Sequence, residues 1–164
     1  MSDIKFGTDG WRAIIAEDFT VANVARVAYA TGLRIINSDL NKNVVIGHDC
    51  RFGGQLFAET TAKVIAAMGI KVYLAKGIVS TPMISLGAHH FKSGFGVVIT
   101  ASHNPASYNG FKLKSAYGGP TIPSEIQLVE DLIPAQAEVP TTSIEELVEN
   151  GKIEYVDLET TYFN

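Results

Sequence analysis

The sequence predicts an α/β fold, namely a three-layer α/β/α domain built around a mixed, mainly parallel sheet. Short apolar runs, typical of buried strands, alternate with longer segments whose apolar residues recur at helical spacing. The distances between these runs fit strand–helix–strand units, in which the strands are parallel and the crossovers are right-handed. A chain of 164 residues is long enough to form one such domain with its own core.

The first predicted helix, strand and second helix follow one another in the first seventy residues. Residues 21–36 place apolar and small side chains on one helical face, and Thr20 precedes them as an N-cap residue. The run Val-Val-Ile within 43–47 predicts a short buried strand. Residues 57–68 form a second apolar stripe, which ends at Gly69 as a C-terminal cap.

The middle of the chain predicts two further strands with a helix between them. Strands are expected at 70–74 and 95–100, and a weaker helix at 81–91 begins next to Pro82, which suits a first-turn position. A return strand is expected to carry Lys112, which makes the sheet mixed.

The last fifty residues give weaker signals. Residues 115–123 are rich in Gly and Pro and predict a loop, and residues 125–133 predict a helix. A linker at 134–142, a short helix at 144–149 and a short strand at 153–156 complete the predicted elements.

The composition indicates an ordinary globular protein. The net charge of −4 argues against a nucleic-acid partner, which requires a basic face, and there is no basic amphipathic stretch for a membrane surface. No run approaches the ~20 apolar residues of a membrane span, and the N-terminus has no apolar signal core. Cys50 is the single cysteine, so we expect a reducing compartment and a cytoplasmic protein.

Polar residues follow two of the predicted parallel strands. His48, Asp49 and Arg51 come after the strand at 43–47, and residues 100–104 come after the strand at 95–100. In parallel sheets, ligands bind outside the carboxyl ends of the strands. Both segments are therefore expected at one edge of the sheet, in a shared site.

Residues 100–112 read Thr-Ala-Ser-His-Asn-Pro-Ala-Ser-Tyr-Asn-Gly-Phe-Lys and carry the strongest functional signal. Backbone N–H groups at the end of a strand, among small residues, can form a concave anion site. Ser102 could carry or accept a phosphate there. Asn-Pro and Tyr-Asn-Gly are also common turn sequences, so the residue types alone leave a simple polar turn open.

Three segments of the sequence resemble motifs of the α-D-phosphohexomutases, the phosphoglucomutase/phosphomannomutase family. Residues 100–112 are similar to its phosphoserine loop, residues 6–12 to its opening motif, and residues 47–51 to its Gly-x-Asp-x-Arg segment. The motifs occur in the family's order. The resemblance implies the N-terminal domain I of such an enzyme, over residues 1–155, with residues 156–164 beginning the linker to an absent second domain.

The resemblance implies catalytic roles for four residues. Ser102 would hold the phosphate between transfers, Lys112 and Arg12 would line its site, and His103 would hydrogen-bond the phosphate or the substrate. Without the motifs, Lys112 would be interpreted as a solvated strand lysine and Arg12 as a surface ion-pair partner.

Four further residues would support the phosphate loop, namely Thr100, Asn104, Asp49 and Arg51. Ser102, through its phosphate, would also supply one ligand to Mg²⁺. In the family the remaining ligands come from an Asp-Gly-Asp-x-Asp loop of the second domain, and this sequence contains no such loop.

The implied activity is that of an intramolecular phosphotransferase, which interconverts hexose 1-phosphate and hexose 6-phosphate through a bisphosphate. Mg²⁺ is the implied cofactor and hexose 1,6-bisphosphate the activator, while hexose phosphates and the remaining domains of the enzyme are the implied partners. Because those domains are missing, we expect the isolated chain to be inactive.

Two other functions were weighed. A truncated, non-catalytic module that binds sugar phosphates or a partner chain remains an alternative. A serine hydrolase is disfavoured because the sequence has no Gly-x-Ser-x-Gly elbow. Adjacent residues such as Ser102 and His103 also rarely align as nucleophile and base.

Overall fold

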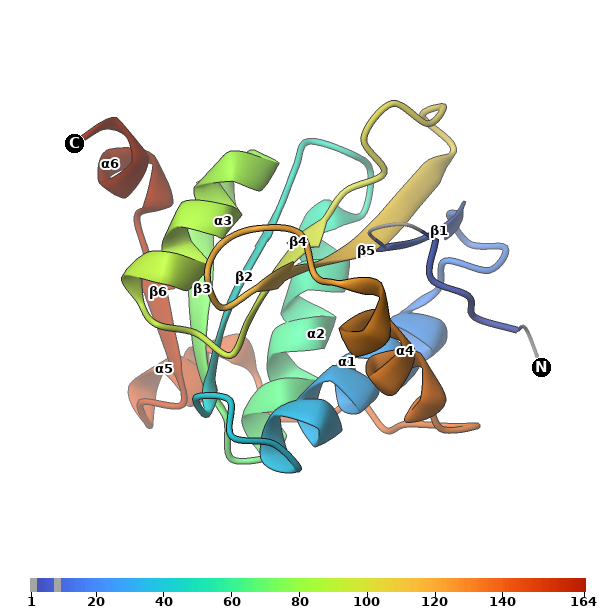
Figure 1. Cartoon of the computed structure of the whole chain (residues 1–164), viewed down its shortest axis with the longest axis horizontal. Coiled ribbons are helices and arrows are strands. Elements are labelled where there is room, and N and C mark those ends of the chain that lie inside the picture. The colour runs from blue at the N-terminus through green and yellow to red at the C-terminus, as the bar shows by residue number, and fades with distance from the viewer. Residues whose placement is uncertain (1–2, 8–9) are drawn as a thin grey trace.

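The computed structural model describes residues 3–7 and 10–164, and across these residues it contains one mixed sheet of six strands with helices on both faces (Figure 1). The strands are β1 (Gly10–Ile14), β2 (Asn43–His48), β3 (Lys71–Ile78), β4 (Phe95–Ile99), β5 (Tyr108–Ser115) and β6 (Ile153–Val156). The helices are α1 (Val21–Ile36), α2 (Gly54–Ala67), α3 (Thr81–His90), α4 (Pro123–Asp131), α5 (Ile144–Glu149) and α6 (Leu158–Phe163).

The strand order is β1-β5-β4-β2-β3-β6. The pairs β4–β2, β2–β3 and β3–β6 are parallel, whereas β5 runs antiparallel to both of its neighbours, β1 and β4. The predicted fold class, with its mixed and mainly parallel sheet, is confirmed.

The helices form two layers that bury opposite faces of the sheet. The larger core lies between the sheet and α1, α2, α4 and α5. A smaller core lies on the other face, beneath α3 and α6 (Figure 1). None of the described helices combines the length and the apolar character needed to cross a bilayer.

Several elements begin and end where the sequence predicts. The helix α1 matches its predicted range, and the side chain of Thr20 accepts a hydrogen bond from the backbone N–H of Asn23 at 3.2 Å. The helix α5 and the strand β6 match as well. These elements carry strong local signals, either a capping side chain or an apolar run bounded by polar residues.

Other boundaries were predicted wrongly. The helix α2 begins at Gly54 rather than at residue 57, because its N-cap is Gly53 with φ +77°, which offers no capping side chain as a signal. The strand β3 continues to Ile78 through an irregularity in its pairing with β2; of the four added residues Ala75 is buried, and the last three are exposed. The strand β1 and the helix α6 were not predicted.

The helix α6 is set by a capping residue that the sequence analysis overlooked. The Asp157 carboxylate accepts hydrogen bonds from the backbone N–H and the hydroxyl of Thr160. These bonds, the backbone one first, hold the pKa of Asp157 below its ordinary value. Leu158 is buried and lies against Gly87 of α3, where a β-carbon at position 87 would come within 3.0 Å of it.

An aromatic cluster fixes the edge strand β1. The ring of Phe19, which is fully buried, stacks on Trp11 of β1 with centroids 4.6 Å apart and meets Phe57 of α2 edge-on at 4.7 Å. Because β1 has only one strand neighbour, this cluster and β5 together set its position. Arg12, the next residue along β1, depends on that placement.

Replacing Phe19 by Ala is therefore expected to lower the free energy of unfolding by about 3–5 kcal/mol, through lost burial and the cavity left behind. Phe163→Ala is the matched control, because the Phe163 side chain is 72% exposed and its removal should change stability by less than about 0.5 kcal/mol. Urea denaturation of both variants measures the difference. Equal losses would show that the cluster does not anchor β1.

Candidate functional site

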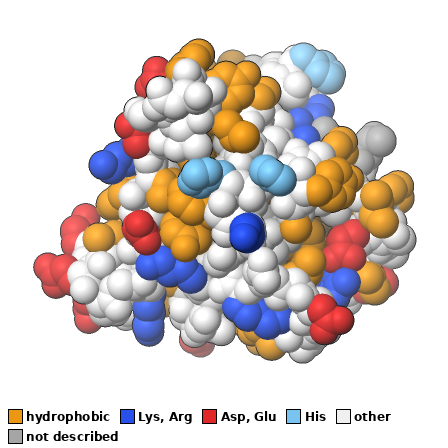
Figure 2. All heavy atoms as spheres, turned by 60° about the vertical axis from the view of Figure 1, so that its left-hand side comes forward, with side chains coloured by type: hydrophobic (Ala, Val, Ile, Leu, Met, Phe, Trp, Pro, Cys, Tyr) orange, Lys and Arg blue, Asp and Glu red, His pale blue; other side chains and the backbone are white. Residues whose placement is uncertain are grey.

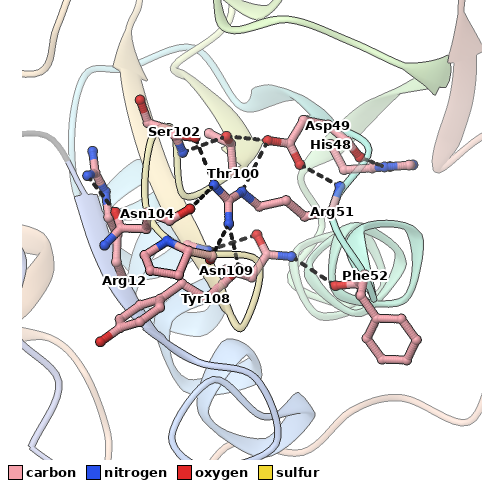
Figure 3. A network of polar contacts seen from close by, with 12 residues as sticks. Arg12, His48, Asp49, Arg51, Phe52, Thr100, Ser102, Asn104, Tyr108 and Asn109 are labelled. Carbon is pink, nitrogen blue, oxygen red and sulfur yellow. Dashed lines mark hydrogen bonds and ion pairs between the residues drawn. The ribbon is translucent and has the colours of Figure 1, made fainter.

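The loops that follow β2 and β4 meet at the carboxyl edge of the parallel strands. His48 pairs with Ile99 in the β2–β4 register, and the backbone N–H of Asp49 donates to the Ile99 carbonyl at 3.1 Å. The sheet register thus places residues 49–53 beside residues 100–107 (Figure 3). The prediction that both polar segments share one edge is confirmed.

The guanidinium of Arg51 binds the backbone of the second loop. Its Nη1 donates to the carbonyls of Pro105 at 2.8 Å and Tyr108 at 3.0 Å. Its Nη2 donates to the carbonyls of Ser102 at 2.8 Å and Asn104 at 2.7 Å. Three carbonyls of the loop of residues 101–107, and that of Tyr108 at the start of β5, therefore point to a single cation, as Figure 3 shows.

Asp49 and Thr100 form a second link between the loops. The hydroxyl of Thr100 donates to Asp49 Oδ2 at 2.5 Å, and the backbone N–H of Arg51 donates to Asp49 Oδ1 at 3.0 Å. Arg51 Nε also lies 3.8 Å from Asp49 Oδ2. Asp49 therefore joins the end of β4 to the backbone and side chain of Arg51.

Ser102 occupies the outer side of this loop. Its side chain is exposed, and its backbone has a φ of +52°, in the left-handed region that is costly for residues other than glycine. Its N–H donates to Thr100 Oγ1 at 3.1 Å, and its carbonyl is held by Arg51. The strained conformation is thus fixed from both sides of the residue.

Two of the predicted cations lie on one face of the sheet. Arg12 pairs with Gly110, and Lys112 pairs with Gly10 and with Val98 of the smaller core, so both side chains lie on the α3 face of the sheet. Arg12 Nη1 donates to Asn104 Oδ1 at 2.9 Å, which connects β1 to the loop of residues 101–107. Lys112 is buried within β5. It pairs with Val98 of β4, next to the end of β4 from which the chain continues to Ser102.

The remaining predicted residue is less constrained. His103 is exposed next to Ser102, and its ring makes no hydrogen bond within residues 3–7 and 10–164. Thr8 and Asp9 of the N-terminal motif lie outside the described residues.

The sequence analysis missed Asn109, which follows the loop in β5. The side chain is fully buried, with Nδ2 donating to the Phe52 carbonyl at 3.2 Å and Oδ1 accepting from the Gly110 N–H at 2.8 Å. Tyr-Asn-Gly, which the residue types left open as a turn, instead begins β5 at Tyr108. No local pattern marks this amide, because its partners are backbone groups of Phe52 and Gly110.

Gly110 allows the strands around the site to approach closely. A β-carbon at this position would lie 2.4 Å from the carbonyl oxygen of Thr100 and 3.0 Å from that of Trp11. Both obstacles are backbone atoms, which cannot move aside cheaply. The packing of β4 and β1 against β5 at the site therefore requires glycine at this position.

A cavity of about 450 Å³ lies next to the first loop, not at Ser102. It is lined by that loop, by the start of α2, by the end of β3 and by Tyr155 of β6. Ser102 instead stands on open surface. In the described part of the chain, no three His, Cys, Asp or Glu side chains come together as a metal site would require.

Comparison with known proteins identifies the family. The family model for phosphoglucomutase/phosphomannomutase, α/β/α domain I, matches residues 3–140. A probable phosphoribomutase of Schizosaccharomyces pombe is 36% identical over 92% of this chain and 26% of its own. A phosphoglucosamine mutase of Alkaliphilus oremlandii is 39% identical over 74% of this chain and 27% of its own.

A solved structure agrees with the sequence relatives. The putative phosphomannomutase of Thermus thermophilus superposes with a TM-score of 0.89 at 39% identity, over 99% of this chain and 35% of that protein. The chain thus spans about a quarter to a third of the length of the proteins that it matches. It belongs to the phosphoglucomutase/phosphomannomutase family and corresponds to its α/β/α domain I.

Proposed function

We propose that this chain is the phosphoserine-bearing domain of a phosphohexomutase that interconverts hexose 1-phosphate and hexose 6-phosphate. The observation that carries the proposal is the loop of residues 101–107, where three carbonyls turn inward to Arg51, together with that of Tyr108, while Ser102 stays exposed on its outer side. The relatives are named for different sugars, and the choice of hexose rests on the resemblance of the three motifs.

The loop geometry suits an anion. Because four carbonyls face Arg51, the outer side of the loop presents fewer acceptor oxygens to a phosphate on Ser102. Within the described residues, the backbone N–H of His103 has no acceptor, so it remains available to a phosphate oxygen. Arg12 and Lys112 add positive charge on the α3 side of the sheet.

The proposed reaction passes one phosphoryl group between Ser102 and the sugar. The free 1- or 6-hydroxyl oxygen of a hexose monophosphate attacks the phosphorus of phosphorylated Ser102, a new sugar O–P bond forms, and the Ser102 Oγ–P bond breaks. The proton of the sugar hydroxyl returns to Ser102 Oγ, directly or through a neighbouring group, and a hexose bisphosphate results. The reverse step from the other end of the bisphosphate restores the phosphoserine, so the bisphosphate also acts as activator.

Positioning and electrostatics supply most of the catalysis of phosphoryl transfer. In this scheme Arg12 and Lys112 oppose the negative charge that spreads over the moving oxygens. The loop that carries Ser102 is held in place by four residues, namely Thr100, Asp49, Arg51 and Asn104. His103 is assigned a hydrogen bond to the phosphate or the sugar.

Magnesium fits this chain only in part. A phosphate on Ser102 would offer one hard oxygen ligand, but the described residues bring no group of carboxylates to it. The other ligands would have to come from outside the chain, as would further contacts to the sugar. When bound, the ion would neutralise charge on the phosphate. We place the assembled enzyme in the cytoplasm.

A non-catalytic module that binds a partner chain is the second candidate. Large apolar side chains are exposed at Phe52, Ile78 and Phe163, and Figure 2 shows apolar patches on the face that carries α3 and α6. The same patches would contact the remaining domains of a mutase. Self-association of the isolated chain, seen as a mass that rises with concentration, would favour the second candidate.

The proposal predicts that the isolated chain has no mutase turnover, because it holds one metal ligand and lacks the rest of the sugar site. A coupled assay of glucose 1-phosphate conversion, run with and without Mg²⁺, measures this. Turnover at a rate typical of complete enzymes, roughly 1–10³ s⁻¹, would refute the assignment of this chain as one part of a larger site.

The Ser102→Ala variant is expected to abolish phosphorylation of the protein. In the longer protein that contains this domain, incubation with glucose 1,6-bisphosphate should add one phosphate to the wild type and none to the variant, as read by intact mass. Ser107→Ala is the matched control, since Ser107 is an exposed serine of the same loop. The Ser107→Ala variant should still be phosphorylated at Ser102. Phosphate on the Ser102→Ala variant would disprove the nucleophile.

Arg51→Lys is expected to slow phosphoryl transfer by roughly 10²-fold, because Lys keeps the charge but lacks the planar fork of N–H groups that binds the four carbonyls. Arg34→Lys is the control, because Arg34 pairs with Glu125 on α4, away from the loop. The rate of Ser102 phosphorylation measures both variants. If they are equally active, the fork of Arg51 does not position the loop.

A further inference from the structure

The buried amide of Asn109 connects the strand β5 to the backbone next to Arg51, the residue that holds the loop of residues 101–107. Asn109 faces the same side of the sheet as Phe111 and Leu113, within the larger core, while Gly110 and Lys112 face the opposite side. Its Nδ2 donates to the Phe52 carbonyl, and its Oδ1 accepts from the Gly110 N–H. A buried amide with both ends paired is expensive to replace, because each partner would be left without its bond.

The Phe52 carbonyl is the important partner, because Phe52 follows Arg51 directly. The bond from Asn109 ties the backbone next to Arg51 to the strand β5. The side chain of Arg51 then returns to the Tyr108 carbonyl, and Tyr108 precedes Asn109 in the same strand. The contacts close a ring from Asn109 through Phe52 and Arg51 to Tyr108, visible in Figure 3.

Only an amide fits this ring. A carboxylate of the same shape could accept from the Gly110 N–H, but it has no hydrogen to donate to Phe52. Among the described residues, the side-chain links that would still tie residues 51–52 to the second loop are the contacts of Asp49 and the long, flexible side chain of Arg51 itself.

We propose that Asn109 is a positioning residue. It fixes the backbone next to Arg51, so that the guanidinium of Arg51 holds the loop of residues 101–107. The consequence for phosphoryl transfer rests on the proposed function, but the consequence for loop order does not. The amide touches neither the serine nor the sugar, and it acts entirely through Arg51.

The experiment compares Asn109→Asp with Asn43→Ala. Asn43 provides a matched control, since its Nδ2 also donates to a backbone carbonyl, that of Phe91, at 3.2 Å, but at the opposite end of β2. Amide hydrogen exchange is measured on the 164-residue chain for the N–H groups of Ser102 and Asn104, which donate to Thr100 Oγ1 and to the Ala101 carbonyl. Asn109→Asp should raise exchange at both at least about 10-fold, while Asn43→Ala leaves it unchanged.

The same variants are then tested for transfer in the longer protein that contains this domain. Asn109→Asp should lower the rate of Ser102 phosphorylation by roughly 10- to 100-fold, with the KM for the hexose bisphosphate nearly unchanged. The double variant with Arg51→Lys should lose no more than Arg51→Lys alone, because both act on one contact set. If the loss of rate in the double variant equals the product of the two single losses, the proposal is overturned.

The two readouts separate the possible failures. Faster exchange in the loop without any Ser102 phosphorylation, even in the wild type, would support the positioning role and refute the proposed function. Unchanged exchange in the Asn109→Asp variant would overturn the positioning role. If that variant does not fold, Asn109→Ser replaces it, because its short hydroxyl cannot reach the Phe52 carbonyl and the same exchange comparison decides.

Discussion

The guanidinium of Arg51 is the interaction on which the shape of the site depends. Residues 101–107 form few backbone hydrogen bonds of their own, such as that from the Asn104 N–H to the Ala101 carbonyl. Hydrogen bonds from a charged donor contribute about 1.5–3 kcal/mol each, whereas a left-handed residue such as Ser102 costs about 1–2 kcal/mol. Even one of the four bonds therefore offsets the strain of the serine.

The strand order of the sheet brings Arg51 within reach of this loop. The strands β2 and β4 are adjacent and parallel, so their carboxyl ends release the two loops side by side. The strand β5 then returns antiparallel beside β4 and carries the Tyr108 carbonyl and the Asn109 amide back to the same place. A different strand order would leave Arg51 facing solvent.

Sequence reasoning found the residue types of the site but not the bonds between them. Arg51 was selected as a support because it follows a strand end and lies in the segment that resembles the family's Gly-x-Asp-x-Arg motif, and both are local patterns. Its acceptors are backbone carbonyls that lie 51 to 57 positions away, and a carbonyl is the same for every residue type. The role of Asn109 was not predicted for the same reason. The strand β1 was not predicted because its pairing partner, β5, lies about a hundred residues further along the chain.

The site uses its cations for two different purposes. The two Nη atoms of Arg51 are committed to four carbonyls, and its Nε faces Asp49, so its five N–H groups are directed at protein atoms. A phosphate on Ser102 adds a charge of about −1.5 to −2, which Arg51 can oppose only from behind the loop. Arg12 and Lys112 lie together on the α3 face of β1 and β5, where Lys112 is buried. Directional bonding to the backbone is therefore the task of Arg51, and under the proposed function Arg12 and Lys112 would oppose the charge of the phosphate.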